Sequence, residues 1–542
     1  MFRSNTARQN SSRSFIRSTF QAFIILAIFI VLVIPNDIRW ISATEFLYLP
    51  LEILLTGIFL LLPGRIGLTL RIIAVLLLAI GSICKMADMA ALQIFSRLFN
   101  PLLDAHLLGD GLHLLQGSLG KIAALAIAAL LALAVGGIFL LSYLALARIQ
   151  VLLQSSRSTS MVLLLTGLLC WMGLWLAGSQ RASLSFYHLL AEHTSDAFNS
   201  FVDLKAFRKI VDIDSYSNTP GDQLLGALQG KDVLVIFVES YGRTALDKPD
   251  FATNIRPLLE KSSAELAAAG LSARSAYLTS PTAGGISWLA HATLMSGLWI
   301  NSQVRYDSLT SSERPTLNRL FQRAGWRTLA VQPAHTMDWP AGAYFGYDKI
   351  YSAGDLDYKG KPFNWVTMPD QYTLAALQKY ERQTIARAPI MAEIALISSH
   401  APWTPIPELI DWSQVGDGSI FNAQASAGDS PEVVWQDNAR IQQQYRKAIE
   451  YSLATIISFA LHYGDENLVL LVLGDHQPAP LVTGETANRD VPVHLISRDA
   501  KVMAAVQAWQ WSEGLLPAEQ APAWPMDTVR NRLLEAFSPA AE

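Results

Sequence analysis

Long apolar runs crowd the first third of this sequence, and this feature limits its possible folds more than any other. A helix that crosses a membrane needs about 20 mostly apolar residues. Five runs approach that length, at residues 20–34, 46–62, 66–83, 123–146 and 161–177. We therefore predict that residues 1–178 form a transmembrane domain of five helices and that the protein is integral to a membrane.

Arginines gather on one side of this predicted domain. They are Arg3, Arg8, Arg13, Arg17, Arg65, Arg148 and Arg157. The positive-inside rule then places the N-terminus in the cytoplasm and everything after residue 177 outside. We expect a multi-pass protein of the bacterial cytoplasmic (inner) membrane, with its globular part periplasmic or extracellular. A cleaved signal peptide is the alternative for the first run, but a small-residue cleavage site is missing and four further runs follow.

Two segments join the apolar runs to each other and to the rest of the chain. Residues 85–121 mix apolar and charged side chains at helical spacing, so we expect them to lie at the membrane surface. Residues 179–230 are predicted to form an interfacial helix followed by a linker. Within this connector, His188 and His193 are expected to be solvated.

The remainder of the chain reads as a globular sequence without features of a nucleic-acid-binding protein. The formal net charge is -4 and Lys and Arg form no stripe, so nucleic acid is not an expected partner. The two cysteines, Cys84 and Cys170, lie in the apolar first third. Metal binding through thiolates is therefore excluded in the globular part.

From residue 231 onward, short apolar runs alternate with longer helical stretches. The clearest runs are VLVIFV (233–238), TLAV (328–331), IALI (394–397) and LVLLVL (468–473). Runs that are apolar on both faces are typical of parallel strands covered by helices on both sides. We predict that residues 231–542 form an α/β three-layer domain with a mostly parallel sheet.

Each of these four runs is followed by a side chain that can bind a metal or move a proton. Glu239 follows the first run, His335 the second, His400 the third, and Asp475 with His476 the fourth. In open α/β sheets, ligands bind beyond the carboxyl ends of the strands. We expect a shared site at this edge, with chance as the alternative because strands often end in a polar residue.

The segment YLTSPTAGGISWLAHATLMSGLW begins as a loop and becomes a helix. Gly284 and Gly285 permit a close approach of the backbone to a ligand, and Ser287 stands where a helix cap is expected. A helix N-terminus favours a bound phosphate or sulfate and a serine alkoxide. Ser287 is therefore a candidate nucleophile, and an ordinary N-cap is the alternative.

These motifs resemble the alkaline phosphatase superfamily, and in particular its membrane-anchored sulfatase-like transferases, which include lipoteichoic acid synthases and phosphoethanolamine transferases. SWLAHATLMSG matches the helix of sulfatases that begins at the nucleophile, so the resemblance makes Ser287 the nucleophile and Gly297 the closing glycine. FGYDKIY resembles a segment of the transferases that act on lipids. Five spans followed by this domain is also the layout of the synthases.

The same resemblance assigns roles to the strand-end residues. IFVESYG places Glu239 on the metal carboxylate of the first strand, and LGDHQP places Asp475 and His476 on the Asp-His metal pair. SSHAPW places His400 on the histidine that faces the substrate. With Ser287, the implied ligand set holds one divalent metal ion; we expect Mn²⁺, with Zn²⁺ or Mg²⁺ as alternatives.

The chain also departs from the family pattern. His291 replaces the arginine of sulfatases, and the box required for formylglycine formation is missing, which argues against sulfatase chemistry. The phosphotransferases usually use threonine, so Thr279 and Thr282 are alternative nucleophiles. Residues expected to line a substrate pocket, with a structural role as the alternative, are His291, His335 and Trp339.

The resemblance implies a transferase that moves a phosphoglycerol- or phosphoethanolamine-type head group. The donor is a membrane phospholipid, the acceptor is a glycan or lipid-glycan of the cell envelope, and the intermediate is a phosphoserine at Ser287. His400 would protonate the leaving oxygen. Alternatives are a phosphodiesterase, phosphatase or sulfatase-type hydrolase with the same site, and an inactive membrane sensor. A transporter is disfavoured because the apolar runs hold almost no charge, Arg71 being the main exception.

Overall fold

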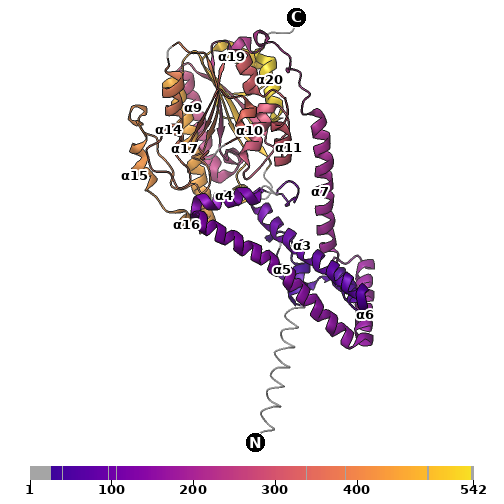
Figure 1. Ribbon diagram of the computed structural model, residues 1–542. Helices are drawn as coiled ribbons and strands as arrows, with labels where there is room; N and C mark the ends of the chain where they lie inside the picture. Colours follow the sequence, from indigo (N-terminus) through magenta and orange to yellow (C-terminus); the bar gives the residue numbers. More distant parts are fainter. Residues whose placement is uncertain are drawn as a thin grey trace. The chain divides into compact units, whose positions relative to one another are not determined.

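The computed structural model describes most of the chain and divides it into two compact units (Figure 1). The described residues are 26–38, 41–95, 97–104, 107–336, 339–384, 386–484 and 488–538. The first unit comprises Met1–Leu92 and Arg97–Val202, and the second comprises Gln93–Ser96 and Asp203–Glu542. The whole of the predicted globular part, residues 231–542, therefore belongs to the second unit.

The first unit is helical. Within the described residues, three helices are long and apolar enough to cross a membrane: α3 (Gly64–Phe95), α5 (Lys121–Ser155) and α6 (Arg157–Leu176). They contain the third, fourth and fifth predicted runs. The α-helix within the second run, α2 (Leu51–Leu60), has only ten residues. The first run begins outside the described residues, and the four arginines that precede it lie outside them too. A membrane anchor is supported, and five spans are not confirmed.

The third run is longer than predicted. Helix α3 continues to Phe95, so it includes the first eleven residues of the segment that was predicted to lie at the membrane surface. The physical reason is that Lys85, which is 5% exposed, finds partners inside the unit. Its Nζ donates to the carbonyls of Val31, Leu32 and Ile34, at 2.8, 3.2 and 2.6 Å. Helix α4 (Leu107–Leu119) follows before α5.

One turn further along α3, Asp88 lies in a second buried contact. Its carboxylate accepts from Asn36 Nδ2 at 3.1 Å and lies 3.0 Å from His193 Nε2. His193 belongs to helix α7 (Ser185–Ile210) and is 7% exposed, so its predicted solvation is wrong, whereas His188 is exposed as predicted. The hydrogen bond that His193 makes to the Asp88 carboxylate is what makes burial of an imidazole acceptable there.

The second unit is built on one sheet whose described strands follow the order β10-β4-β9-β8-β3-β7-β5-β6, with β11 beside β4. Their bounds are β3 Asp232–Val238, β4 Ser272–Thr279, β5 Arg327–Gln332, β6 Lys349–Ser352, β7 Ile390–Leu396, β8 Leu468–Gly474, β9 Asp490–Ser497, β10 Ser512–Glu513 and β11 Ala523–Pro525. The four predicted strands are the adjacent strands β8, β3, β7 and β5, and they pair in parallel. Strand β9 is antiparallel to both of its neighbours.

Helices cover both faces of this sheet (Figure 1). The main ones are α9 (Pro249–Ala268), α10 (Ser287–Ser296), α11 (Gln303–Thr310), α12 (Leu317–Arg323), α14 (Asp370–Leu377), α17 (Asn438–Tyr463), α19 (Ala500–Ala505) and α20 (Thr528–Phe537). Shorter helices are α8 (Thr244–Asp247), α13 (Gly342–Phe345), α15 (Asn422–Ala425), α16 (Pro431–Val434) and α18 (Pro480–Thr483). Because successive side chains of a strand point to opposite faces, the buried strand β3 contributes to two separate cores. Leu234 and Ile236 pack with α9 and α17, while Val235 and Phe237 pack with α10, α12 and α20. The predicted three-layer α/β class with a mostly parallel sheet is confirmed.

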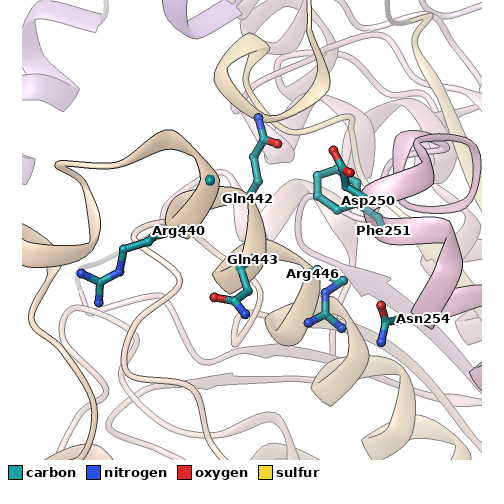
Figure 2. A pocket seen from close by; sticks show the side chains of 8 residues that line it. Asp250, Phe251, Asn254, Arg440, Gln442, Gln443 and Arg446 are labelled. Carbon is teal, nitrogen blue, oxygen red and sulfur yellow. The ribbon is translucent and has the colours of Figure 1, made fainter.

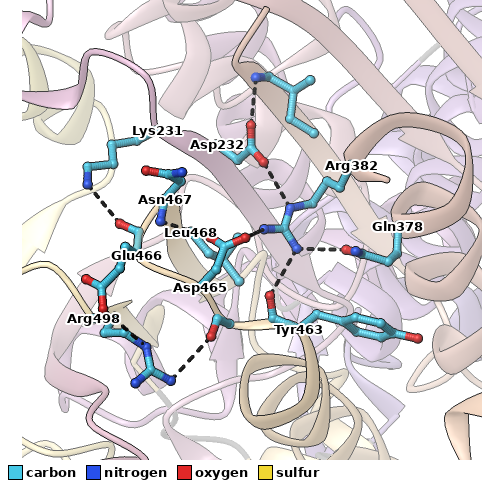
Figure 3. A network of polar contacts seen from close by, with 12 residues as sticks. Lys231, Asp232, Gln378, Arg382, Tyr463, Asp465, Glu466, Asn467, Leu468 and Arg498 are labelled. Carbon is cyan, nitrogen blue, oxygen red and sulfur yellow. Dashed lines mark hydrogen bonds and ion pairs between the residues drawn. The ribbon is translucent and has the colours of Figure 1, made fainter. Parts of the chain in front are cut away.

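A buried ion network fixes the amino ends of the central strands (Figure 3). Asp232, the first residue of β3, accepts from the backbone N–H of Ile390 on β7 at 3.1 Å and from Arg382 Nε at 3.0 Å. Arg387 pairs with the same carboxylate at 2.6 Å. Arg382 also reaches Asp465, just before β8. The network therefore joins the neighbouring strands β3, β7 and β8 at their amino ends. Their carboxyl ends then lie at the same level at the opposite edge of the sheet.

Candidate metal centre and nucleophile

Strand register brings three predicted ligands together. In the parallel pair β3 and β8, Val238 lies opposite Gly474, so Glu239 and Asp475 leave the sheet side by side. Glu239, Asp475 and His476 are all buried, and one ligand atom of each lies within 4.8 Å of the others. The shared edge expected from the sequence is present for these three residues.

Hydrogen bonds orient each member of this cluster. Asp475 Oδ1 accepts from the backbone N–H groups of Ser240 and His476, at 2.8 and 2.6 Å. The Ser240 hydroxyl donates to Glu239 Oε1 at 2.8 Å. His476 Nδ1 lies 2.8 Å from the carbonyl of Gln477, which can only accept, so Nδ1 carries the proton. His476 Nε2 is then a free donor atom for a metal, 3.4 Å from Glu239 Oε1.

The charges of this cluster fit a divalent cation. Burial, and then the neighbouring Glu239, raise the pKa of the Asp475 carboxyl well above its ordinary value. Burial would also raise the pKa of Glu239, but His400 and His476 hold it down to about 2. Two carboxyl groups buried side by side are unfavourable unless a positive charge balances them. Two carboxylates and one imidazole are a donor set that Mn²⁺, Zn²⁺ and Mg²⁺ can all use.

Ser287 adds its hydroxyl to this cluster. Its Oγ donates to Glu239 Oε2 at 2.9 Å and lies 3.3 Å from His476 Nε2. The alternative role of Ser287 as an ordinary N-cap is contradicted: α10 begins at Ser287 itself, and Ile286 occupies the cap position. The serine side chain is therefore directed to the carboxylate rather than to its own helix.

The backbone before Ser287 is strained. Ile286 has a φ of +64°, which is unusual for a β-branched residue and costs about 1–3 kcal/mol. The loop that leads to it is fixed to the metal-side loop, because the N–H of Gly284, at a φ of +74°, donates to the Gln477 carbonyl at 2.8 Å. Strain of this kind persists where the surrounding structure holds a functional side chain in place.

The two alternative nucleophiles bond elsewhere. The Thr279 hydroxyl donates to Asp490 Oδ1 at 2.8 Å, on the neighbouring strand β9. The Thr282 hydroxyl donates to the carbonyl of Gly285 at 2.7 Å, within its own loop. Both geometries favour Ser287 as the reactive hydroxyl.

His400 lies at the same edge, after β7. The hydroxyl of its neighbour Ser399 donates to the backbone carbonyl of Glu239 at 2.6 Å, and the His400 side chain is near enough to lower the pKa of Glu239. The half-buried His400 ring lies edge-on to Trp365, with the ring centres 4.1 Å apart. A proton-bearing group thus stands beside the cluster and keeps access to solvent.

The three predicted pocket residues form a group of their own. His291, one turn after Ser287 on α10, has Nδ1 at 2.7 Å from Glu393 Oε1. His335 and Trp339 stack with their ring centres 5.1 Å apart. Burial, and then the nearby His291, lower the pKa of His335. The three side chains are therefore neighbours, next to the helix that carries Ser287.

Four contributors were not predicted from the sequence. Ser240 and Ser399 orient Glu239 and Asp475, while Glu393 and Tyr347 hold His291 or its partner. A signal existed for Glu393, because a charged residue inside the apolar run MAEIALI must find a buried partner. The serines carry no local signal, since their role depends on strands that are distant in sequence.

A separate cleft lies on the surface between α9 and α17 (Figure 2). Its volume is about 500 Å³, and it is lined by Asp250, Phe251, Asn254, Ala439, Arg440, Gln442, Gln443 and Arg446. None of the predicted site residues lines it. The cleft is therefore distinct from the cluster around Ser287.

Comparison with known proteins gives a family for this domain. Residues 231–492 match the family model of the sulfatases, and no curated protein matches the chain. Similar solved structures include the lipoteichoic acid synthase LtaP from Listeria monocytogenes, at 12% identity over 62% of this chain and 79% of that chain, with a TM-score of 0.36. The C-terminal periplasmic domain of the phosphoethanolamine transferase EptC from Campylobacter jejuni is similar at 13% identity over 57% and 92%, with a TM-score of 0.37.

The phosphoglycerol transferase GacH from Streptococcus pyogenes, solved with sn-glycerol-1-phosphate, is similar at 11% identity over 61% of this chain and 91% of that chain, with a TM-score of 0.36. The match to the sulfatase model spans both halves of the Glu239, Asp475 and His476 cluster. The sulfatase-like character recognised from the motifs is confirmed for this part of the chain: residues 231–492 form a sulfatase-family domain.

Proposed function

We propose that this protein is a metal-dependent transferase that moves a phosphoglycerol- or phosphoethanolamine-type head group from a membrane phospholipid to a glycan or lipid-glycan acceptor of the cell envelope. The observation that carries the proposal is the position of the Ser287 hydroxyl, 2.9 Å from Glu239 and 3.3 Å from His476. A nucleophile placed within a cation-binding cluster is the arrangement that phosphoryl transfer requires.

In the first half-reaction, Ser287 Oγ loses its proton to solvent and forms a bond to the phosphorus of the phospholipid. The bond between phosphorus and the diacylglycerol oxygen breaks, and His400 gives that oxygen a proton. In the second half-reaction, the acceptor hydroxyl gives its proton to His400 and bonds to phosphorus, while the bond to Ser287 breaks and Ser287 Oγ takes a proton from solvent. Serine and histidine both return to their starting forms.

The cation would be held by Glu239, Asp475, His476 and Ser287. When bound, it supplies positive charge that stabilises the serine alkoxide and the phosphoryl oxygens. We propose Mn²⁺ as the preferred ion. Zn²⁺ and Mg²⁺ are the alternatives, because the oxygen-rich donor set suits all three ions.

The apolar helices support a lipid donor and a location at the inner membrane. Helices α3, α5 and α6 confine the enzyme to the surface in which a phospholipid donor is already concentrated. The periplasmic or extracellular side is proposed from the arginines of the short loops.

The test uses purified full-length protein in phospholipid vesicles with Mn²⁺. Mass spectrometry should detect diacylglycerol and a head-group phosphate on the peptide that contains Ser287, and Ser287→Ala should abolish both. Undiminished release of diacylglycerol from Ser287→Ala would exclude Ser287 as the nucleophile. Addition of an acceptor glycan separates a transferase, which modifies the glycan, from a hydrolase, which releases the free head-group phosphate.

A further inference from the structure

A charged residue lies buried beneath the helix that carries the proposed nucleophile. Glu393 is in the middle of β7 and is 2% exposed, on the sheet face covered by α10. An isolated carboxylate in that position would be strongly unfavourable. Three donors converge on it: His291 Nδ1 at 2.7 Å, Asn318 Nδ2 at 3.5 Å and the Tyr347 hydroxyl in a short hydrogen bond.

These donors come from separate elements, so the arrangement is built by the whole domain. His291 belongs to α10, Asn318 to α12, and Tyr347 to the segment between α13 and β6. Burial, and then Glu393, raise the pKa of Tyr347 well above its ordinary value, so the tyrosine keeps its proton and donates it to Glu393. Hydrogen bonds from three separate elements thus hold the Glu393 carboxylate in place.

The network holds the His291 ring in one orientation. The ring stacks on Phe237 of β3, with the centres 3.7 Å apart and the planes 18° apart. Glu393 accepts from Nδ1, so Nδ1 carries a proton and Nε2 is the atom left for other contacts. The side chain keeps 12% exposure, so part of the ring is open to solvent or substrate.

Several features place this ring beside the reacting group. His291 follows Ser287 by four residues on one helix, so both side chains lie on the same face of α10. Its electrostatic influence reaches Asp475 in the cluster and His335 in the pocket group. The imidazole therefore lies near both the cation-binding cluster and the predicted pocket.

We propose that His291 is a further catalytic residue, whose Nε2–H donates a hydrogen bond to a non-bridging oxygen of the phosphoryl group on its way to Ser287. Glu393 and Tyr347 are positioning residues that act through His291. An imidazole that donates from both nitrogens carries a positive charge, and Glu393 balances it. This inference rests on the proposed function and identifies a recognition element for the phosphoryl group within that site.

Two substitutions separate this role from a merely structural one. His291→Asn keeps a donor at the place of Nδ1, and so keeps the bond to Glu393, but it removes the donor at Nε2. His291→Gln keeps a donor at the place of Nε2 but removes the donor at Nδ1, and with it the bond to Glu393. A structural role predicts that the Asn variant retains more phosphate affinity and activity than the Gln variant. The catalytic role predicts that the Gln variant retains more of both.

The experiment uses the Mn²⁺-loaded full chain in detergent, with inorganic phosphate as the probe in calorimetric titration and diacylglycerol release as the activity. For His291→Asn we expect phosphate affinity to fall by roughly ten- to hundredfold, as for the loss of a hydrogen bond to a charged group. We expect kcat to fall by about a hundredfold, with a smaller fall for Glu393→Gln and for Tyr347→Phe. His291→Gln should retain more of both quantities.

His494→Asn is the matched control, because His494 is a buried histidine whose partners, Tyr241 and Ser275, are outside the site. It should keep phosphate affinity. If a His291 variant does not fold, His291→Ala with added imidazole replaces it, and imidazole should restore phosphate binding. Phosphate affinity in His291→Asn equal to the wild type, or no phosphate binding by the wild type, overturns the inference. Phosphate binding that depends on His291, without diacylglycerol release, overturns the proposed function alone.

Discussion

At the scale of single residues, the cluster combines groups that are unfavourable together in an empty site. Glu239 and Asp475 are 8% and 1% exposed, and each is already supplied with hydrogen-bond donors. Their remaining oxygen lone pairs face His476 Nε2 and the Ser287 hydroxyl. The fold thus holds two carboxyl groups in place before a cation arrives, at a cost in stability that binding reverses.

This view leads to a prediction for metal removal. Asp475→Asn keeps an oxygen that accepts from Ser240 and His476 but removes one of the two buried acids. We expect the metal-free variant to unfold at the same temperature as the metal-free wild type or higher. Saturating Mn²⁺ should stabilise the wild type by about 2–3 kcal/mol at a hundredfold excess over Kd, and the variant much less.

Thermal unfolding with Mn²⁺ or with EDTA measures both effects. Asp232→Asn is the control, because this buried aspartate lies at the far end of β3 and should keep the full metal-dependent shift. An equal shift in Asp475→Asn and the wild type would show that Asp475 is not a ligand.

His494 gives a prediction of pH dependence. It is buried on β9, where Nδ1 lies 2.7 Å from Ser275 Oγ and Nε2 lies 3.2 Å from the Tyr241 hydroxyl. Burial lowers the pKa of His494 from 6.5 to about 3. The unfolded chain takes up this proton below pH 6.5 while the folded chain does not. Stability should therefore fall as the pH drops from 6.5 toward 3, by at most about 1.4 kcal/mol per pH unit.

The measurement is the denaturant midpoint of the metal-free protein at several pH values, followed by tryptophan fluorescence. His494→Asn should be less stable at pH 7, because the Tyr241 hydroxyl loses its acceptor, by about 1–3 kcal/mol. Its midpoint should depend less on pH between 6.5 and 4 than that of the wild type. Parallel pH curves for the two proteins would contradict the assignment to His494.

A site residue could be predicted where a pattern in the nearby sequence indicates its position, and could not where its position depends on distant residues. Glu239, Asp475 and His476 directly follow apolar runs, so a local pattern together with the parallel-sheet rule brought them to one edge. The direction of the Ser287 side chain could not be predicted, because it depends on the left-handed φ of Ile286. The partnership of His291 with Glu393 joins residues 102 positions apart, which no local pattern records.

At the scale of secondary structure, continuous burial made the central strands predictable. Strands β3 and β8 are buried at every position, and apart from Asp232 at the start of β3 their sequences are unbroken apolar runs. Strand β9 and its antiparallel partner β4 carry His494 and Arg274 among their apolar residues, so neither stood out. The extension of α3 was missed because the partner of Asp88, His193, is 105 residues away.

The ion network at the amino ends of the strands gives the prediction at this scale. Burial would raise the pKa of Asp232, but the hydrogen bond from Arg387 and the other contacts lower it, so the carboxylate is charged at neutral pH. Arg382→Met removes one partner, whose side chain is 2% exposed, and leaves the buried charge poorly balanced. We expect a loss of about 3–5 kcal/mol in the free energy of unfolding, with kcat per folded molecule unchanged.

Denaturant unfolding and active-site titration measure these two quantities. Arg440→Met is the matched control, because Arg440 and its partner Asp429 are 38% and 56% exposed. Its effect should stay below about 1 kcal/mol. A comparable loss in both variants would show that burial of the Asp232 network adds nothing to stability.

At the scale of the whole molecule, we predict the membrane orientation from the three long helices without the first two predicted runs. Arg65 lies at the start of α3, and Arg148 and Arg157 lie where α5 meets α6. If α3, α5 and α6 each cross the membrane, these arginines share one side and the residues after α6 lie on the other.

Cysteine labelling tests this orientation. In a background with Cys84→Ala and Cys170→Ala, a single cysteine is introduced as Ser156→Cys or as Ser430→Cys, both at exposed positions. A maleimide that cannot cross membranes should label Ser430→Cys in intact spheroplasts and Ser156→Cys only after lysis. Labelling of Ser156→Cys in intact cells would reverse the proposed orientation.

The last prediction separates catalysis from membrane attachment. Both core clusters of the second unit and the whole Ser287 cluster lie between Phe207 and Phe537, so residues 203–542 contain every side chain of the proposed chemistry. This fragment should fold, bind Mn²⁺ and cleave a soluble phosphodiester at a rate within a few-fold of the full chain. On phospholipid vesicles it should be slower by about a hundredfold, because the helices no longer hold the site at the local concentration of lipid. A chelating lipid that recaptures a His-tagged fragment on the vesicle should restore much of that rate. If the fragment turns over vesicle lipid as fast as the full chain, the apolar helices serve a purpose other than delivery of the donor.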